Sequence, residues 1–509
     1  MPGRRSGGEP TIAAVDVGTS GARAAIFDLG GRRLLEVRRP YATHAPRPGW
    51  AEQDAALWRS ASLAALGEVL RRAPGRPLAI ALTGQCPSVV GLDGRGRPTG
   101  PGLLYRDNRA VREAAEFRRR LGAAEVHRLT GHLPAAFHVA PKLLWLRRHQ
   151  PDRFAATRAF LQPRDLVALA LTGELATDGT HAAATLLYAL EARRWHEPYL
   201  EAWALDPRLF PAVLPSSAVL GSLRPALVRR FGLRGPLPVV IGGADSQACA
   251  LGCGLLDPGL ASEMAGSSTC LNTVVERPLP VLEVTHYPHV VGEHFTTETG
   301  LNTTGAAVAW LARLLFGGAG AAGEAQAYAR LDAEAGAVPA GADGLLVLPV
   351  LGDGERTDPT LRGAMVGLSE RHGRGHLARA MLEGVAYAMR AQLELVLAPG
   401  QPLRELRVSG GDARLAAWNQ IKADVIGLPV RVVEGDAAVT GVAMLAGLGC
   451  GVYRSPADAV DRATRLGGVW LPNLAARRLH DERYPAWRAL WAARVARSLA
   501  SGRAHPKGA

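Results

Sequence analysis

Two glycine-rich β-hairpins constrain the fold of this chain more than any other feature of its sequence. From Thr11 to Val37 an apolar strand, a glycine-rich turn, a second apolar strand, a turn at Gly30-Gly31 and a short third strand follow one another, which is the pattern of a β-meander. A similar unit recurs from Leu256 to Val275, with its turn at 266–269. Each hairpin opens one half of the chain, so the sequence predicts an internal duplication.

The segments behind each hairpin alternate between strands and helices. In the second half, apolar residues recur at helical spacing over 377–397, strand patterns occupy 403–408 and 429–433, and helical patterns occupy 413–426 and 438–448. This order predicts a parallel sheet with crossover helices. A chain of 509 residues exceeds what one hydrophobic core usually supports, so we expect two α/β domains.

The formal net charge of +13 invites comparison with nucleic-acid-binding proteins. Lysine occurs only at Lys142, Lys422 and Lys507, so nearly all of the positive charge comes from arginines spread along the whole chain. The densest cluster, Arg118 to Arg120, follows two nearby glutamates and has the mixed charge of a solvated helix face. The distribution favours a bias of composition over a binding patch, and we expect no nucleic-acid partner.

No segment of the sequence has the pattern of a targeting or membrane segment. Residues 1–10 are basic and rich in glycine but lack the apolar core of a signal peptide, and Asp16 interrupts the apolar run that follows. No stretch approaches the roughly 18 uncharged apolar residues that a membrane span needs. The five cysteines form no Cys-x-x-Cys pair and no zinc-like spacing, which favours reduced thiols. We therefore expect a cytoplasmic protein with no membrane partner.

The turn of the first hairpin has the residues of a phosphate site. It contains two glycines and two hydroxyl residues, in the order Gly18, Thr19, Ser20 and Gly21. The glycines permit a tight turn, so that amide hydrogens and hydroxyls can converge on one anion. Asp16 is placed to hold Mg2+ through a water molecule, and Arg23 can offset phosphate charge. An ordinary hairpin is the alternative, because such turns are common.

A second candidate is a carboxylate at the end of an apolar strand. Residues 239–244 have the pattern of a strand that delivers Asp245 and Ser246 just before a helix. Ligands of α/β sheets bind beyond the carboxyl ends of parallel strands, so Asp245 could take a proton from a substrate hydroxyl. The alternative, which this segment alone favours, is that Asp245 caps the following helix.

Two further glycine-rich turns lie in the second half of the chain. The turn of the second hairpin carries one glycine and three hydroxyl residues: Gly266, Ser267, Ser268 and Thr269. It could grip the phosphates of the same nucleotide. Gly410 and Gly411, between a strand and a helix that contains Asn419, would let a flat ring or a ribose approach the backbone closely. A bare Gly-Gly also fits a tight strand-to-helix turn, so neither turn is decisive alone.

The order of these features resembles the FGGY family of carbohydrate kinases from about Ile12 to Leu490, with xylulokinases as the most similar members. The segments between them resemble the family as well: Trp50-Ala51-Glu52-Gln53-Asp54, Tyr105-Arg106-Asp107-Asn108-Arg109, Ala140-Pro141-Lys142-Leu143-Leu144-Trp145, Leu171-Thr172-Gly173-Glu174, Gly305-Ala306-Ala307, Gly354-Glu355-Arg356-Thr357, Leu382-Glu383-Gly384-Val385 and Ala423-Asp424. So many matches in the same order make the resemblance specific.

The resemblance implies two ribonuclease-H-like α/β domains of the actin-like ATPase type with an interdomain cleft. An N-terminal domain over 11–253 would bind the sugar, and a C-terminal domain over 254–500 would bind ATP. The implied activity is ATP-dependent phosphorylation of a small sugar, first of all a pentulose, with Mg2+ as cofactor. Asp245 would act as the general base, and Asp16 as the residue linked to the metal through water.

The resemblance also implies the residues around each substrate. ATP contacts are expected from Gly18, Thr19, Ser20, Arg23, Gly266, Ser267, Ser268, Thr269, Gly305, Gly410, Gly411, Asp412 and Asn419. Sugar contacts are expected from Gln85, Cys86, Pro87, Tyr105, Asp107, His138, Asp245 and Ser246.

Two departures from the family pattern affect these expectations. The second glycine turn usually has a third glycine and a later serine, where this chain has Asp412 and Leu415, which predicts reshaped adenine contacts. The Met-His pair of xylulokinases is Cys86-Pro87 here, and the Arg-Glu pair of glycerol kinases is absent. Ribulose, fuculose, erythritol and glycerol types therefore stay open as alternative substrates.

Two alternatives belong to other functional classes. One is a regulator that binds sugar and ATP without turnover, and the retained Asp16 and Asp245 argue against it. The other is a filament-forming actin-like protein, which the segments shared with sugar kinases disfavour. The sequence leaves the oligomeric state open, with a homodimer as one alternative.

Overall fold

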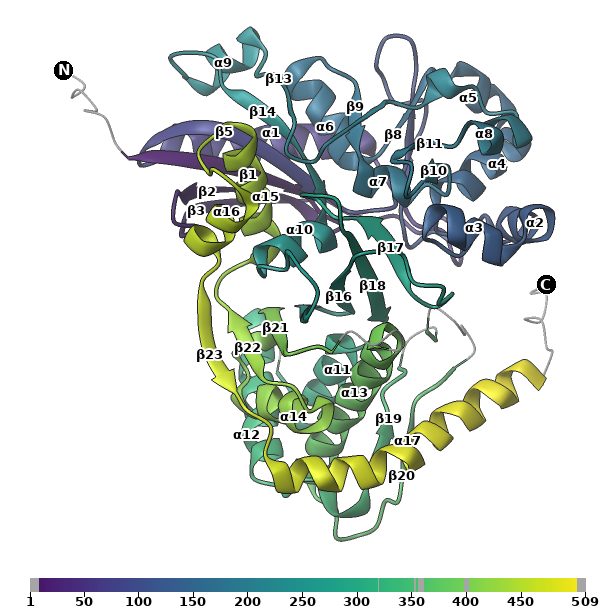
Figure 1. The fold of residues 1–509 in the computed structure, drawn as a ribbon, viewed down its shortest axis with the longest axis vertical. Coiled ribbons are helices and arrows are strands. Elements are labelled where there is room, and N and C mark those ends of the chain that lie inside the picture. The colour runs from purple at the N-terminus through teal and green to yellow at the C-terminus, as the bar shows by residue number, and fades with distance from the viewer. Residues whose placement is uncertain (1–8, 319, 352–353, 356–360, 398–401, 501–509) are drawn as a thin grey trace. The chain divides into compact units, whose positions relative to one another are not determined.

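The computed structural model describes residues 9–318, 320–351, 354–355, 361–397 and 402–500 (Figure 1). The chain forms two units. Unit 1 consists of Met1–Asp257, Val274–Thr297 and Gly435–Arg465, and unit 2 of Pro258–Thr273, Glu298–Glu434 and Leu466–Ala509. Unit 1 therefore takes in two segments from the second half of the sequence. The expected domain boundary at residues 253 and 254 stays a prediction, and Arg356 and Thr357 lie outside the described residues.

A six-stranded sheet forms the centre of unit 1, in the order β13-β14-β5-β1-β2-β3. Its strands are β13 (Val219–Ser222), β14 (Pro238–Ala244), β5 (Arg76–Gly84), β1 (Pro10–Val17), β2 (Gly21–Asp28) and β3 (Arg33–Pro40). Strand β2 pairs antiparallel with β1 and with β3, which confirms the meander predicted from the first hairpin. Strand β5 pairs parallel with β1 and with β14.

Helices and short strands surround this sheet. The helices of unit 1 are α1 (Ala55–Arg72), α2 (Val111–Leu121), α3 (Ala123–Thr130), α4 (Val139–His149), α5 (Pro151–Ala156), α6 (Pro163–Thr172), α7 (Gly179–Ala183), α8 (Glu197–Ala202), η1 (Pro207–Leu209), α9 (Pro225–Phe231), α10 (Asp245–Gly252), α15 (Ala437–Gly449) and α16 (Pro456–Ala463). Its short strands are β4 (Glu52–Gln53), β6 (Val90–Leu92), β7 (Gly102–Leu103), β8 (Ala159–Leu161), β9 (Ala176–Asp178), β10 (Tyr188–Ala189), β11 (Arg194–Trp195) and β12 (Ala212–Leu214). Strand β17 (Thr285–Pro288) also belongs to unit 1 but pairs within the seven-stranded sheet.

The side chains of β1 alternate between the two faces of the sheet. Ala13, Val15 and Val17 belong to an apolar cluster with residues of α1 and α6. Ile12 and Ala14 belong to a second cluster with residues of α10, α15 and α16. Strand β1 is thus covered on both faces, which explains why its sequence is a continuous apolar run and not an alternating one.

A seven-stranded sheet, in the order β17-β18-β16-β15-β21-β22-β23, contains the main strands of unit 2. These strands are β18 (Phe295–Leu301), β16 (Thr269–Val275), β15 (Leu260–Ala265), β21 (Glu405–Gly410), β22 (Val430–Val433) and β23 (Leu466–Trp470). Strands β15 and β16 pair antiparallel, and β15, β21 and β22 pair parallel. The order from β18 to β22 repeats the order from β3 to β14, which confirms the predicted duplication and the ribonuclease-H-like fold.

The helices of unit 2 agree with the predicted pattern. They are α11 (Gly305–Phe316), α12 (Gly320–Gly336), η2 (Ala342–Gly344), α13 (Arg374–Leu397), η3 (Asp412–Arg414), α14 (Ala416–Ile426) and α17 (Leu474–Ala500), and two more strands are β19 (Leu346–Leu348) and β20 (Ala364–Val366). The helix expected over 377–397 is α13, and the helix expected over 413–426 is the short η3 followed by α14. Sequence periodicity therefore located these elements to within a few residues of their bounds.

Helices α10 and α15 of unit 1 lie in direct backbone contact. A Cβ atom added to Gly441 of α15 would lie 1.9 Å from the carbonyl oxygen of Ala248, and one added to Gly252 of α10 would lie 1.9 Å from that of Ala437. Backbone atoms of two helices cannot yield as a flexible side chain can. Glycine at both positions therefore permits α10 and α15 to pack side by side on the sheet.

We predict that Gly441→Ala destabilises unit 1 by about 1–3 kcal/mol, the usual cost of inserting a methyl group into a well-packed core. The higher helix propensity of alanine offsets at most about 1 kcal/mol of this cost. Urea unfolding followed by circular dichroism measures the change. Gly235→Ala is the control, because a Cβ there would have no heavy atom within 4 Å. Equal unfolding midpoints for the two variants would show that α10 and α15 can separate without loss.

Candidate active site

The predicted site residues fall into one group in each unit. Unit 1 holds Asp16, Gly18, Thr19, Ser20, Arg23, Gln85, Cys86, Pro87, Tyr105, Asp107, His138, Asp245 and Ser246. Unit 2 holds Gly266, Ser267, Ser268, Thr269, Gly305, Gly410, Gly411, Asp412 and Asn419.

The register of three parallel strands brings the key residues of unit 1 to one edge of its sheet. Val17 of β1 pairs with Gly84 of β5, and Gly84 pairs with Ala244 of β14. The first glycine turn (18–21), the segment that begins at Gln85 and the carboxylate of Asp245 therefore leave neighbouring strands at the same level. This is the position at which α/β sheets bind their ligands.

The first glycine turn is held from one side through its carbonyl groups. The Gly18 amide donates to the Gly21 carbonyl at 3.1 Å and closes the turn. The Gly18 carbonyl accepts from the Tyr41 hydroxyl at 2.6 Å, and the Thr19 carbonyl accepts from the Gln53 amide at 2.6 Å. A Cβ atom at Gly21 would lie 2.6 Å from a carbonyl oxygen of β3, so this position requires glycine. The hydroxyls and amide hydrogens of Thr19 and Ser20 are the groups left to face an anion.

Asp16 lies at the end of β1 in a chain of charged groups. Its Oδ2 accepts from Nη2 of Arg23 at 3.0 Å, and Arg23 also bonds Asp436, which caps α15 by accepting from the Val439 amide. Burial raises the pKa of Asp16, and the guanidinium of Arg23 opposes that change. The half-buried carboxylate thus keeps a cation beside it while part of its surface stays open.

The surroundings of Asp16 fit a magnesium ion that accompanies a nucleotide. Among the described residues, no group of three or more His, Cys, Asp and Glu side chains is arranged to hold a metal. Mg2+ in kinases usually takes only one or two carboxylates, together with water and substrate phosphates. Asp16, which Arg23 joins to Asp436, supplies one such carboxylate beside the first glycine turn. The bond from Arg23 to Asp16 goes to Oδ2.

Asp245 is the first residue of α10, directly after β14. The cap position before it is held by Ala244, so Asp245 lies one residue inside the helix. Its Oδ1 accepts a hydrogen bond from the Ser246 amide at 2.9 Å. The helix-cap alternative therefore does not describe its position, and Ser246 itself is buried.

A buried polar network holds the end of β14 that carries Asp245. The Thr180 hydroxyl accepts from the Ala244 amide at 2.8 Å and donates to Oδ2 of Asp178 at 2.6 Å. Arg164 donates to Asp178 and to the carbonyl of Ile241. Although burial alone would raise it, Arg164 and His181 hold the pKa of Asp178 below its usual value. Asp178 is ionised in this network, and the bonds of Thr180 to Ala244 and of Arg164 to Ile241 fix the end of β14 that carries Asp245.

Sequence reasoning missed this network. Asp178 and Thr180 follow the family-like segment Leu171 to Glu174, and that proximity is the only signal they offered. Their role depends on contacts with β14, which lies more than 60 residues further along the chain.

Gln85 connects the first glycine turn with the loop that carries Tyr105. Its amide nitrogen donates to the Gly18 carbonyl at 3.3 Å and to the side chain of Gln53 at 3.1 Å. Its Oε1 accepts from the Ser88 hydroxyl, which in turn accepts from the Tyr105 amide at 3.1 Å. Gln85 is 2% exposed, so these protein contacts occupy its amide.

Asp107 organises the same loop from inside the protein. It is fully buried, accepts from the Ala51 amide at 2.7 Å and pairs with Arg109. The Arg109 guanidinium lies 3.7 Å from the ring centre of Trp50. Tyr105, two residues earlier, is 37% exposed, so it can meet a ligand while Asp107 shapes the loop beneath it.

The remaining residues of the expected sugar side lie on two other segments. Cys86 is half-buried against an apolar cluster, and Pro87 is buried. His138 is buried just before α4, with its Nε2 3.3 Å from Nδ1 of His132.

In unit 2, the glycine turns meet through backbone contact. A Cβ atom at Gly305 would lie 2.2 Å from the carbonyl oxygen of Gly266, and the Ala306 amide donates to the Ser267 carbonyl at 3.0 Å. A Cβ atom at Gly410, where φ is +119°, would lie 2.1 Å from a carbonyl oxygen of β15. The turn after β15, the start of α11 and the end of β21 are therefore adjacent. Ser267, Ser268 and Gly411 are exposed there.

Buried charges lie behind these turns. Lys422 donates to Glu263 at 2.6 Å, and both side chains are almost fully buried. Burial and the nearby carboxylate of Glu263 raise the pKa of Asp412, and Lys422 opposes them. The resulting pKa is about 6. Asn419 is fully buried and donates to the Ala413 carbonyl, so it supports the turn from within.

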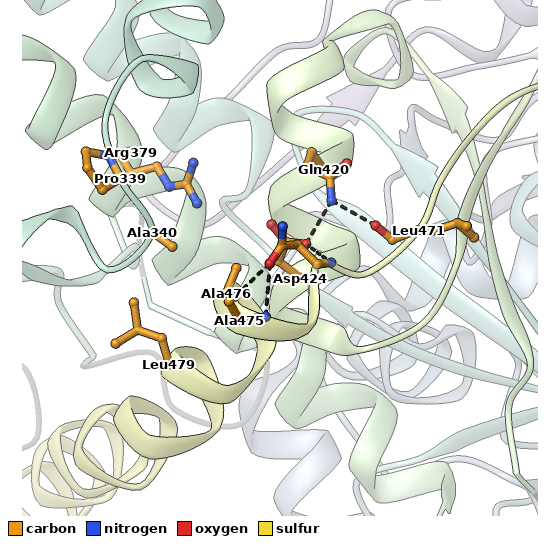
Figure 2. A pocket seen from close by; sticks show the side chains of 10 residues that line it. Pro339, Ala340, Arg379, Gln420, Asp424, Leu471, Ala475, Ala476 and Leu479 are labelled. Atoms are coloured by element: carbon orange, nitrogen blue, oxygen red, sulfur yellow. Dashed lines mark hydrogen bonds between the residues drawn. The ribbon is translucent and has the colours of Figure 1, made fainter.

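A pocket of about 620 Å³ lies in unit 2 (Figure 2). Its lining consists of Pro339, Ala340, Arg379, Gln420, Asp424, Leu471, Asn473, Ala475, Ala476 and Leu479. None of these belongs to either group of candidate residues. In the described part of the chain, no helix is long and apolar enough to cross a membrane.

We predict that Asp412→Asn stabilises the protein at pH 7.5 and has little effect near pH 4. The folded carboxyl has a pKa of about 6 against a reference value of 3.8, so the folded state binds more protons between these values. The unfolding free energy therefore falls as pH rises from about 4 to about 6. A neutral amide avoids this loss, which is about 1–3 kcal/mol. Urea unfolding at both pH values measures it, and equal stabilisation at both would contradict a charge effect.

Comparison with known proteins places this arrangement among sugar kinases. Residues 11–252 match the N-terminal domain of the FGGY family of carbohydrate kinases. Residues 261–450 match the C-terminal domain of the same family. The xylulose kinase of Escherichia coli is 32% identical over 421 residues, which cover 81% of this chain and 84% of that protein. A glycerol kinase of Gloeobacter violaceus is 31% identical over 460 residues, 88% of this chain and 90% of that protein. The crystal structure of xylulose kinase from Rhodospirillum rubrum has a TM-score of 0.87 at 32% identity, over 95% of this chain and 98% of that one.

Proposed function

The chain belongs to the FGGY family of carbohydrate kinases, and we propose that it transfers the γ-phosphoryl group of ATP to a hydroxyl of a small sugar, first of all a pentulose. Two kinds of observation support this proposal. Relatives that cover most of the chain are named xylulose kinases. The single structural observation that carries it is the carboxylate of Asp245, held at the end of β14 by a buried network on the same sheet edge as the phosphate turn.

The reaction can be written with the residues of this chain. Asp245 accepts the proton of a primary hydroxyl as that oxygen bonds the γ-phosphorus, and the bond to the β-phosphate oxygen breaks to release ADP. Amide hydrogens and hydroxyls of Thr19 and Ser20 would stabilise the transferring group, and the turn from Gly266 to Thr269 is the second predicted phosphate contact. Asp16 would hold Mg2+ through water, and the ion would neutralise phosphate charge. A homodimer and a cytoplasmic location stay predictions.

We predict that Asp245→Asn lowers sugar phosphorylation by ~10²–10⁴, the range typical for loss of a general base. The asparagine keeps the shape of the side chain but cannot accept the proton. Nucleotide binding should stay nearly intact, because Asp245 does not contact ATP in this scheme. A coupled assay of ADP release measures turnover, and calorimetry measures nucleotide affinity.

The matched control for this test is Asp257→Asn, which removes an exposed carboxylate shortly after the same helix. It should turn over at the wild-type rate. If Asp245→Asn also kept that rate, the general-base assignment would be wrong, and the family membership would be unaffected.

The Cys86-Pro87 segment bears on which sugar is bound. Cys86 packs against an apolar cluster that includes Ala183 and Tyr188. A thiol is a weak hydrogen-bond donor, and proline has neither a polar side-chain atom nor an amide hydrogen. A site without a hydrogen-bonding group cannot strongly select the hydroxyl that such a group would contact. We infer an apolar environment beside one sugar hydroxyl.

We therefore predict that a deoxy, reduced or differently configured sugar is phosphorylated at least as efficiently as D-xylulose. The panel consists of D-xylulose, D-ribulose, L-ribulose, L-xylulose, L-fuculose, glycerol and erythritol, and kcat/KM is measured for each. A wide margin in favour of D-xylulose would refute the inference from Cys86-Pro87. In that case a neighbouring residue supplies the missing contact: Arg106 and His138 stay candidates, whereas protein contacts occupy the polar atoms of Gln85 and Ser88.

A further inference from the structure

The ammonium group of Lys142 is buried and bonds three loop segments of unit 1. Apart from Asp245 and Ser246, these segments carry all of the expected sugar contacts. Nζ of Lys142, on α4, donates to the carbonyl oxygens of Leu104 and Phe137 at 2.6 Å each, and to that of Pro87 at 3.3 Å. Leu104 directly precedes Tyr105, Phe137 directly precedes His138, and Pro87 directly follows Cys86. The segment of Pro87 follows β5, the segment of Leu104 follows β7, and the segment of Phe137 precedes α4.

The geometry of this contact suits lysine and not arginine. An ammonium has three N–H donors around one atom, so it can bond three carbonyls that converge on a point, whereas the donors of arginine lie in a flat fork. Only three lysines occur in this arginine-rich chain, and Lys142 and Lys422 are both fully buried. Lys422 pairs with a carboxylate, but the bonds of Lys142 go to neutral carbonyls.

A buried charge without a bonded counter-ion is costly, because it loses its hydration. Asp107 attracts the ammonium without bonding it and so raises its pKa, and Cys86 acts in the same direction. Arg109 repels the ammonium and lowers its pKa. Burial lowers the pKa of Lys142 to about 7. The group therefore changes its charge near neutral pH, and the amine formed above that value has two donors for three carbonyls.

We infer that Lys142 is the positioning residue of the sugar site: its ammonium ties the segments of Cys86, Tyr105 and His138 to one point and so sets the geometry in which they meet the sugar. The side chain is fully buried beneath these segments and does not itself touch the sugar. This inference rests on the proposed function, in which these segments bind the sugar.

Steady-state kinetics of three variants test the inference. Lys142→Met removes the donors at similar length, Lys142→Arg keeps the charge, and Arg148→Met is the control, an exposed cation on the same helix. We expect Lys142→Met to raise the KM for the best sugar of the panel at least about tenfold, the effect of losing about 1.4 kcal/mol. The KM for ATP should change less than about twofold, and Arg148→Met should change neither.

The pH profile supplies a readout that a purely structural role would not move. In the wild type, the KM for the sugar should rise as pH increases from 6 to 9, because the ammonium loses a proton around pH 7. Lys142→Arg should flatten this rise, because arginine keeps its charge. A flat wild-type profile, or equal effects of Lys142→Met on the KM values of sugar and ATP, would overturn the inference.

Hydrogen exchange separates failure of this inference from failure of the proposed function. Lys142→Met should speed amide exchange by roughly tenfold in residues 86–89, 104–107 and 137–139 together, with β1 unchanged. If no sugar of the panel is phosphorylated but these segments loosen together, the positioning role stands and the proposed substrate class fails. Unchanged exchange in the three segments would overturn the positioning role. If Lys142→Met does not fold, Lys142→Arg and the wild-type pH profile decide.

Discussion

The parallel pairing of β1, β5 and β14 is the constraint on which the candidate site of unit 1 depends. Because Val17, Gly84 and Ala244 pair across neighbouring strands, the chain leaves all three strands at one level. The same pairing recurs in unit 2, where Ala265 of β15 lies opposite Gly410 of β21. In each unit, a glycine turn and the segment after a parallel strand come together without help from long loops. A shift of one residue in either register would turn every side chain of that strand to the other face.

Buried charges support these sheet edges in three clusters, around Asp178, Lys422 and Lys142. Each cluster compensates the lost hydration of its charge in a different way. Asp178 is ionised and bonded to Arg164, Thr180 and Ser216. Lys422 is neutralised by Glu263. The hydrogen bonds of Lys142 go to carbonyl oxygens, and Asp107 attracts its charge without bonding it. Breaking a satisfied buried pair leaves an uncompensated charge, which is strongly destabilising. Such groups keep loops in place even before a ligand binds.

Much of the fold was predictable because its signals are local. The apolar runs of β1 and β2 and the glycines between them predict a hairpin from a few neighbouring residues, and the periodicity of α13 extends over several turns. The order of elements then implies a duplicated parallel sheet. Local signals could not predict that the segment Gly435–Arg465, which follows β22, packs within unit 1. Its helix α15 is apolar nearly all round, so its sequence does not say which sheet it covers.

By itself the sequence determined the two hairpins and the family, and it singled out Asp16 and Asp245 as candidate site residues, because these depend on short motifs and their order. The tertiary structure decided how those residues are held. Thr180 supports Ala244 across 64 residues, Arg23 reaches Asp436 across 413, and Lys142 meets Pro87 across 55. It also decided that the polar atoms of Gln85 and Asp107 bond other groups of the protein and do not face an open surface. Contacts between residues so far apart depend on how strands pair and helices pack, and no local pattern encodes them.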